Sequence, residues 1–215
     1  DFDTAKSFFN TSLEELHDPF KMKDMDVAVS RIKWAIDNEE KILIFGDYDV
    51  DGTTAVTLMY EFLSSIYPHV SYYIPDRNNE GYGISYQSID YAIAQNISLV
   101  IALDCGIKAH EQIDYANSKN IDFIICDHHL PDKSIPNAYA VLDPKRKGCH
   151  YPYKELSGCG VGFKLVQAYI KQFQLSTEII DSLLDLVAVS IAADIVPITG
   201  ENRILAYSGL KRLNT

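Results

Sequence analysis

The chain alternates short apolar runs with longer segments whose apolar residues recur at helical spacing, and this alternation limits the fold more than any single motif. The apolar runs are predicted strands, and they cover residues 41–46, 69–75, 97–104, 121–127 and 138–143. The segments before and between them are predicted helices, at residues 24–38, 53–67, 85–96 and 108–120. Such a pattern is typical of a parallel sheet covered on both faces. We therefore predict an α/β fold with a doubly wound, mainly parallel five-stranded sheet flanked by helices, and a mostly helical C-terminal portion over residues 160–213.

Acidic and imidazole side chains follow the predicted strands at the point where each strand ends. In an open parallel sheet, ligands bind outside the carboxyl ends of the strands, so these side chains are expected to converge on one edge. The first strand is followed by Asp47, Asp49 and Asp51, and the third by Asp104. The second strand ends before Asp76 and Arg77, the fourth before Asp127, His128 and His129, and the fifth before Asp143.

The segment DYDVDG, residues 47–52, places three carboxylates on one short turn, where like charges repel. It matches the first half of an EF-hand calcium loop, but the twelfth position, normally a glutamate, is Leu58, and an apolar strand precedes the loop. A plain strand-to-helix turn is a second alternative, although it needs only one capping aspartate. A divalent-cation site accounts for all three carboxylates.

Carboxylates gathered with imidazoles favour Mn²⁺ or Mg²⁺ over metals that prefer thiolates. Five or six such groups suit two ions, about 3.5–4 Å apart, better than one ion that keeps its waters. We expect Asp104 to bridge them, because its strand should lie near the middle of the sheet. Two ions would lower the pKa of a shared water and clamp a phosphoryl group, which indicates hydrolysis of a phosphate ester or anhydride. Neither a G-x-S-x-G nor a G-x-x-x-x-G-K-[ST] motif is present.

Three residues allow more than one interpretation. His128 and His129 are neighbours, and beyond a strand end one could ligate a metal while the other faces the scissile phosphate. Asp194 interrupts an apolar helical run shortly before Pro197, where it could equally cap a turn or bind a metal.

The composition is that of a globular protein, with 47% hydrophobic and 23% charged residues. No apolar run approaches the roughly 20 residues that span a bilayer, and the polar start DFDTAKSFFN is unlike a signal peptide. The four cysteines form no C-x-x-C pair, which fits a reducing cytoplasm. The net charge of −11 argues against a broad nucleic-acid-binding surface, although bound cations would neutralise part of it. Because no initiator Met is present, we expect a piece of a longer chain.

Six ordered motifs resemble those of the DHH phosphoesterase superfamily, named for the triplet Asp127-His128-His129. They are GDYDVDGTTA, IPDRNNEGYGIS, DCGI, CDHHLP, AVLDPKRKGCHYPYKELSGCGVGFKL and AADIVPITGENR. The resemblance extends from Leu16 to the end and is closer to the RecJ-like branch of exonucleases specific for single-stranded DNA. Pyrophosphatase-like members begin the first motif with a histidine ligand, whereas Phe45 stands there in this chain, which supports the exonuclease branch.

The resemblance implies two Mn²⁺ or Mg²⁺ ions and assigns roles to the motif residues. Asp127 would orient the imidazole of His128, and His129 would act at the scissile phosphate. Arg77 is a candidate to hold a substrate phosphate through two hydrogen bonds. The implied metal ligands are Asp49, Asp51, Asp104, His128 and Asp194, with Asp104 bridging and Asp47 either a ligand or a support.

A domain division and a function follow from the same resemblance. Residues 1–23 would be an N-terminal lead-in, 24–200 the catalytic domain, and 201–215 the start of a connecting helix toward a second domain that this sequence lacks. The implied activity is 5′-to-3′ digestion of single-stranded DNA in recombination and repair, by a cytoplasmic monomer without membrane attachment. A single-strand-binding protein and a helicase are the implied partners. The alternatives are a phosphodiesterase for short oligonucleotides or cyclic dinucleotides, and a non-catalytic replication scaffold.

Overall fold

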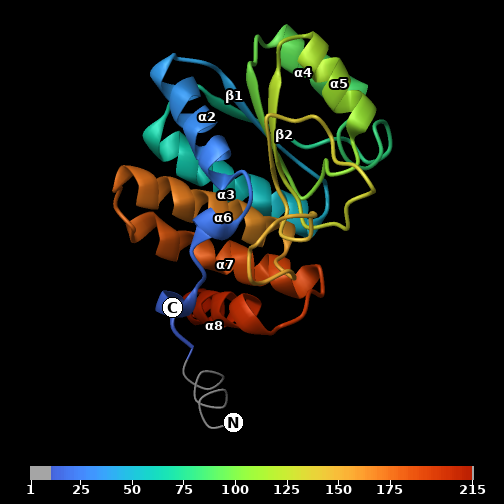
Figure 1. Ribbon diagram of the computed structural model, residues 1–215. Helices are drawn as coiled ribbons and strands as arrows, with labels where there is room; N and C mark the ends of the chain where they lie inside the picture. Colours follow the sequence, from blue (N-terminus) through green and yellow to red (C-terminus); the bar gives the residue numbers. More distant parts are fainter. Residues whose placement is uncertain (1–10, 215) are drawn as a thin grey trace.

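The computed structural model describes residues 11–214, and within that range it contains one five-stranded sheet (Figure 1). The strands are β1 (Ile42–Gly46), β2 (Val70–Tyr73), β3 (Leu99–Leu103), β4 (Asp122–Cys126) and β5 (Ala140–Leu142), in the order β2-β1-β3-β4-β5. All neighbouring strands are parallel, which confirms the predicted α/β fold. The chain start that we expect not to be a signal peptide, residues 1–10, lies outside the described residues.

The two faces of the sheet have separate apolar cores, because successive side chains of a strand point to opposite faces. Ile44 of β1 is aligned with Ile101 of β3, and both belong to the first core. Phe45 and Ala102, one position further along, belong to the second core. Both faces are therefore covered, which explains why these strands are continuous apolar runs in the sequence.

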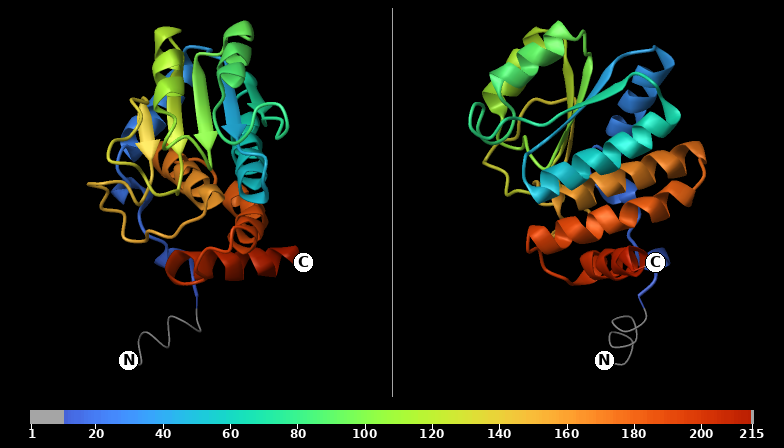
Figure 2. Two further views of the ribbon diagram at one scale, coloured as in Figure 1. Left: turned by 90° about the vertical axis from the view of Figure 1, so that its right-hand side faces the viewer. Right: turned by 180° about the vertical axis from the view of Figure 1, so that it is seen from behind.

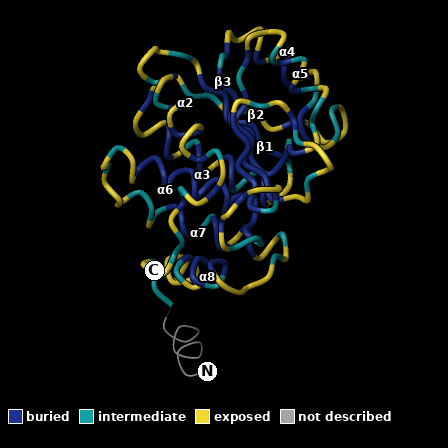
Figure 3. The backbone as a smooth tube through the Cα atoms, viewed as in Figure 1, coloured by how far each residue is buried: buried dark blue, intermediate teal, exposed yellow. Residues whose placement is uncertain are grey.

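Helices cover the sheet on both sides (Figures 1 and 2). Helices α4 (Tyr86–Ala94) and α5 (His110–Ser118) lie on one face and supply apolar side chains to the second core. On the other face lie α2 (Met25–Asp37), α3 (Val50–Ile66) and α6 (Gly158–Phe173). Helices α7 (Glu178–Ala193) and α8 (Gly200–Leu213) pack beyond α3 and α6, so the predicted helical C-terminal portion is present, with its break around Pro197. The buried residues concentrate on the strands and on the helix faces turned toward them (Figure 3).

The direction in which strands are added to the sheet reverses between β1 and β3. The chain moves from β1 outward to β2, then returns past β1 to β3 and continues through β4 to the outermost strand β5. Such a reversal opens a crevice at the carboxyl ends of the two strands, where ligands bind in doubly wound sheets. Because β3 is the middle strand, Asp104 lies at the centre of this edge, as expected.

Helix α3 begins earlier than the sequence pattern predicts. We expect it to start at Thr53, but the structure begins it at Val50, with Asp49 as the N-cap. The hydroxyl groups of Thr53 and Thr54 donate to the carbonyls of Asp49 and Val50 within the first turn. Asp51 consequently lies inside the first turn of a helix instead of on a free loop, which decides what its side chain can reach.

The lead-in and α8 are attached to the domain by a buried polar group. The short 3-10 helices η1 (Leu13–Glu15) and η2 (Pro19–Lys21) pack against α8 and α6. Glu201 at the start of α8 accepts hydrogen bonds from the backbone N–H of His17, from Tyr151 and from Lys164 of α6. The division at residues 23/24 and 200/201 stays a prediction. None of the helices within residues 11–214 has the length and apolar character needed to cross a membrane.

Candidate metal centre

The three aspartates after β1 occupy three different environments. Asp47 is buried (1% exposed), and this burial raises the pKa of its carboxyl group. Asp49 is exposed, and its Oδ1 atom accepts a hydrogen bond of 2.9 Å from the backbone N–H of Gly52, which makes it the cap of α3. Asp51 is buried again, and its side chain points away from the turn toward α6. The alternating sequence therefore does not produce three equivalent ligands.

Asp51 connects three helices through its carboxylate. Its Oδ2 atom accepts a hydrogen bond of 2.7 Å from the N–H of Gly158, and its Oδ1 atom accepts one of 2.8 Å from Cys159 at the N-terminus of α6. The hydroxyl of Ser190, in α7, donates a further hydrogen bond of 2.7 Å to Oδ1. A carboxylate at this position is favoured because the first N–H groups of a helix have no partners within the helix and carry partial positive charge.

Asp104 lies directly after β3, with its backbone in the left-handed region (φ 59°) and its side chain 2% exposed. Helix α6 approaches it so closely that a Cβ on Gly158 would lie 2.5 Å from the Asp104 Oδ1 atom. Burial, and then the negative charge of Asp51, raise the pKa of Asp104 to about 10. A carboxyl group with this pKa gains strongly from a nearby positive charge that stabilises its ionised form.

His128 is surrounded by carboxylates from three parts of the chain. Its Nε2 atom lies 3.2 Å from Asp104 Oδ1, 3.5 Å from Asp194 Oδ2 and 3.8 Å from Asp51 Oδ2. Asp194 reaches this point from the C-terminal end of α7, and burial raises the pKa of its carboxyl group. The structure therefore brings the ends of β3, β4 and α7 and the start of α3 to one place.

Two groups of side chains have ligand atoms close enough to hold a cation, with all atoms of a group within 4.8 Å of one another. The first consists of Asp104, His128 and His129, and the second of Asp51, His128 and Asp194. They share His128. Asp47 and Asp49, also expected as ligands, belong to neither group as the structure stands.

These donors fit divalent cations. Asp104 Oδ1 and both ring nitrogens of His128 are buried and make no hydrogen bond with any other residue of the described chain. Buried polar atoms without partners are rare, and an ion bound by Asp104 Oδ1 and by one ring nitrogen of His128 lowers the cost of burying them. A set of carboxylate oxygens with imidazole nitrogens suits Mn²⁺ or Mg²⁺.

Asp127 differs from the expectation in its imidazole partner. We expect Asp127 to orient the ring of His128, but its Oδ1 atom lies 2.7 Å from Nδ1 of His129. The carboxylate of Asp127 also accepts hydrogen bonds from backbone N–H groups, at Oδ2 from Ile107 and at Oδ1 from His128 and His129. Burial alone would raise the pKa of Asp127, but these interactions, led by that with His129, lower it overall. In return, the contact with Asp127 raises the pKa of His129.

A row of aromatic side chains beside His129 was not foreseen from the sequence. The hydroxyl of Tyr82 lies 3.3 Å from Nε2 of His129 and donates to the backbone carbonyl of Asp104 at 3.3 Å. Tyr48 packs edge-on against Tyr82, and the guanidinium of Arg77 lies 5.3 Å from the centre of the Tyr48 ring. Arg77 is exposed and has no close contact with His129 or Asp104 among the interactions of residues 11–214. The sequence feature that could have pointed to Tyr82 is its position between two glycines, in the motif GYG.

Asp143 lies at the same end of the sheet, as expected from its place after the fifth strand. It follows β5, is fully buried, and its Oδ1 atom accepts a hydrogen bond from the N–H of Lys145. Burial, reinforced by the charge of Asp127, raises the pKa of Asp143 to about 6. Asp143 therefore contributes to the acidic character of this edge without belonging to either ligand group.

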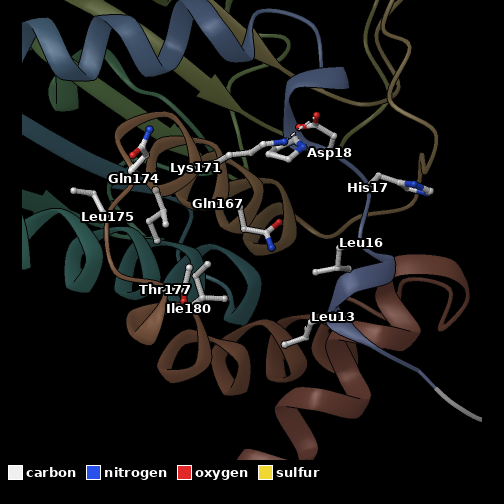
Figure 4. A pocket seen from close by; sticks show the side chains of 12 residues that line it. Leu13, Leu16, His17, Asp18, Gln167, Lys171, Gln174, Leu175, Thr177 and Ile180 are labelled. Atoms are coloured by element: carbon white, nitrogen blue, oxygen red, sulfur yellow. Dashed lines mark ion pairs between the residues drawn. The ribbon is translucent and has the colours of Figure 1, made fainter.

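A hollow of about 490 Å³ lies elsewhere, between the lead-in and the α6–α7 connection (Figure 4). Leu13, Leu16, Ile170 and Ile180 line it together with polar side chains, and Lys171 pairs with Asp18 at 3.0 Å on its rim. Its residues form no cluster of metal-binding groups within the described chain. A smaller hollow of about 180 Å³ adjoins the metal centre and is lined by Tyr82, Gly106, Ile107, Lys108, Asp127 and His129. Of these two hollows, the smaller one is therefore beside the candidate metal ligands.

Most of this chain matches one known protein family. The model of the DHH family, N-terminal domain, matches residues 41–191, which include every motif residue after the strands. The chain belongs to the DHH family. Asp194 lies three residues beyond the matched range, at the end of α7.

Individual relatives of this DHH domain agree with that assignment. The chain is 45% identical over 215 residues to the single-stranded-DNA-specific exonuclease RecJ of Bacillus subtilis, covering 99% of this chain and 27% of the relative. It is 32% identical to the Escherichia coli enzyme of the same name, covering 90% of this chain and 35% of that one. The chain thus spans about a third or less of the length of these relatives.

Solved structures show the same fold. The crystal structure of an exonuclease RecJ bound to manganese superimposes with a TM-score of 0.83 at 30% identity, covering 94% of this chain and 50% of that one. RecJ from Thermus thermophilus in complex with Mn²⁺ superimposes with a TM-score of 0.80 at 26% identity, covering 96% and 29%. The DHH domain of this chain therefore has the architecture of a metal-binding relative.

Proposed function

We propose that this chain is the metal-bearing catalytic domain of a 5′-to-3′ exonuclease for single-stranded DNA that uses two Mn²⁺ or Mg²⁺ ions. The observation that carries the proposal is the pair of ligand groups that share His128 at the carboxyl edge of the sheet. Two adjacent groups suit two ions held side by side, as in enzymes that hydrolyse phosphodiesters. The substrate rests on the relatives, which are named as exonucleases specific for single-stranded DNA. The 5′-to-3′ direction is proposed from the family resemblance of the sequence motifs.

The proposed ligands divide between the two groups. His128 and Asp104 would hold one ion, and Asp51 and Asp194 the other. Asp104 is proposed as the bridge because it follows the central strand of the sheet and its Oδ1 atom lies 3.2 Å from Nε2 of His128, which both groups share. Asp47 and Asp49 are proposed to complete the site from the turn after β1. When bound, such ions supply Lewis-acid activation of water and neutralise charge on the phosphoryl group.

Beside the proposed ions, His129 and Arg77 are the side chains proposed to contact the substrate. Asp127 takes the Nδ1 side of His129 and fixes the ring, so the Nε2 atom remains for the scissile phosphate. The interaction with Asp127 raises the pKa of His129, which favours a protonated ring that can donate to an anionic oxygen. Arg77 is proposed to hold a second phosphate from the exposed loop before Tyr82.

The test is metal-dependent release of nucleotides from a labelled single-stranded DNA oligonucleotide. We expect slow release by this chain with Mn²⁺, weak digestion of long strands, and none by Asp104→Asn. Asp114→Asn, a change of the same kind on the exposed side of α5, is the matched control and should keep full activity. Asp104→Asn with unaltered activity and an unaltered melting temperature would refute the proposed bridging role.

Substrate length separates this proposal from the alternative phosphodiesterase. Long single strands should be digested by the longer parent protein, whereas a phosphodiesterase for short oligonucleotides would prefer dinucleotides. We also propose that the protein acts as a monomer in the cytoplasm, together with a single-strand-binding protein and a helicase. The four cysteines, all buried and free, support a reducing compartment.

A further inference from the structure

The hydroxyl of Tyr82 contacts the ring nitrogen of His129 with which a substrate phosphate is proposed to interact. Asp127 already takes Nδ1 at 2.7 Å, so Nε2 is the remaining nitrogen of that ring, and Tyr82 Oη lies 3.3 Å from it. The same hydroxyl donates to the carbonyl of Asp104. An oxygen in this place makes the contact with Nε2 that a phosphate oxygen would make.

We propose that the substrate displaces Tyr82: the hydroxyl of Tyr82 contacts Nε2 of His129 in the free protein, and a substrate phosphate oxygen then replaces that hydroxyl on Nε2. The inference rests on the proposed function, since it names the group that contacts the substrate. Tyr82, in the GYG motif, thereby has a role that is separate from those of the proposed metal ligands and of Arg77.

Little packing opposes the movement of Tyr82. The residue is 56% exposed, and within the described chain its ring contacts are edge-on contacts with Tyr48 and His129. Its neighbours Gly81 and Gly83 have φ angles of 81° and 79°, and no atom lies within 4 Å of where their Cβ atoms would be. Glycine adopts this left-handed backbone without strain.

The base of the loop is fixed, so movement is confined to its tip. Glu80 accepts hydrogen bonds from the hydroxyl of Tyr73, from the N–H of Asp76 and from the hydroxyl of Ser85. These contacts join the start of the loop to its end just before α4. The hollow of about 180 Å³ between Tyr82, Lys108 and His129 leaves room beside the tip for the incoming group.

The competition has a direction that an experiment can detect. Removing the hydroxyl with Tyr82→Phe keeps the ring but frees Nε2, so a phosphate ligand should bind more tightly. The loss of one hydrogen bond that must be broken corresponds to a gain of about 2- to 10-fold in affinity. A role in which the hydroxyl only supports the active His129 ring predicts the opposite, namely weaker binding.

The experiment titrates the Mg²⁺-loaded chain with thymidine 5′-monophosphate and follows the ¹⁵N signals of the His129 ring by NMR. We expect Tyr82→Phe to shift the Nε2 signal before ligand is added and to lower the Kd. Tyr86→Phe, which changes another exposed tyrosine on α4, is the matched control and should alter neither quantity. A wild-type His129 signal that ignores the nucleotide overturns the proposed function and this inference with it. A wild-type signal that responds, with an equal or higher Kd for Tyr82→Phe, overturns the role of Tyr82 alone.

Discussion

The Oδ2 atom of Asp51 accepts a 2.7 Å hydrogen bond from the backbone N–H of Gly158, a residue 107 positions later in the chain. This contact joins the first turn of α3 to the first turn of α6. It also places the α6 backbone against the side chain of Asp104. The same carboxylate that belongs to a ligand group therefore holds together the helices that shape the site.

Replacing Asp51 should destabilise the fold as well as the site. In Asp51→Ala, the buried donors of Gly158, Cys159 and Ser190 lose their acceptor, and the free energy of unfolding should fall by about 2–4 kcal/mol. Asp49→Ala removes one exposed cap and should cost about 1 kcal/mol. Urea unfolding of both variants without metal measures the difference. Equal losses would contradict the anchoring role of Asp51.

A methyl group on Gly158 should disturb the metal centre. The Cβ of Gly158→Ala would lie 2.5 Å from Asp104 Cβ and Oδ1, so either α6 or Asp104 must move. We expect the Kd for Mn²⁺ to rise by about 10-fold or more, as it does when groups supporting a ligand are changed. Gly160→Ala, two residues along the same helix, meets its nearest atom at 3.3 Å and should change the Kd little. Calorimetric titration with Mn²⁺ compares the two variants.

The edge on which the reactive side chains converge was predictable from the sequence. Short continuous apolar runs identify the strands, and the helical periodicity of the segments between them identifies the helices. The geometry of a parallel sheet then brings Asp104, Asp127 and His128 together. The position of Asp104 at the middle strand follows from the same reasoning. Family resemblance added Asp194, whose local sequence alone leaves a helix end and a ligand equally possible.

The directions of individual side chains were not predictable in the same way. Asp49 and Asp51 differ because α3 begins at Val50, which makes the first a cap and turns the second toward α6. Asp127 lies on His129 because tertiary contacts choose between adjacent rings, which spacing along the chain does not determine. Tyr82 reaches the site through a glycine-flanked loop that has no periodic pattern to reveal it.

The buried carboxyl group of Asp143 should make stability depend on pH in the acidic range. Its pKa in the folded protein is about 6, above the 3.8 of an unperturbed aspartate, so the folded state holds the proton more tightly. The contribution to stability is therefore complete below about pH 4 and is lost as the pH rises through 6, by up to about 3 kcal/mol. Asp143→Asn cannot ionise and should lack this part of the slope. Urea unfolding of both proteins between pH 4 and 7 isolates the contribution, and parallel curves would contradict it.

The ion pair between Lys164 and Glu201 should be the main attachment of α8 to α6. Both side chains are almost completely buried (0% and 1% exposed), at a separation of 3.2 Å between Nζ and Oε1. Lys164→Met leaves the carboxylate of Glu201 buried without its cation, so the free energy of unfolding should fall by about 3–5 kcal/mol. Adding Glu201→Gln removes that uncompensated charge while keeping a partner for Tyr151, and the double variant should regain part of the loss. A double-mutant cycle in urea measures the coupling. If the second change instead adds its full cost to the first, the charge of Lys164 is not what holds Glu201, and α8 must be attached by its apolar contacts with α7.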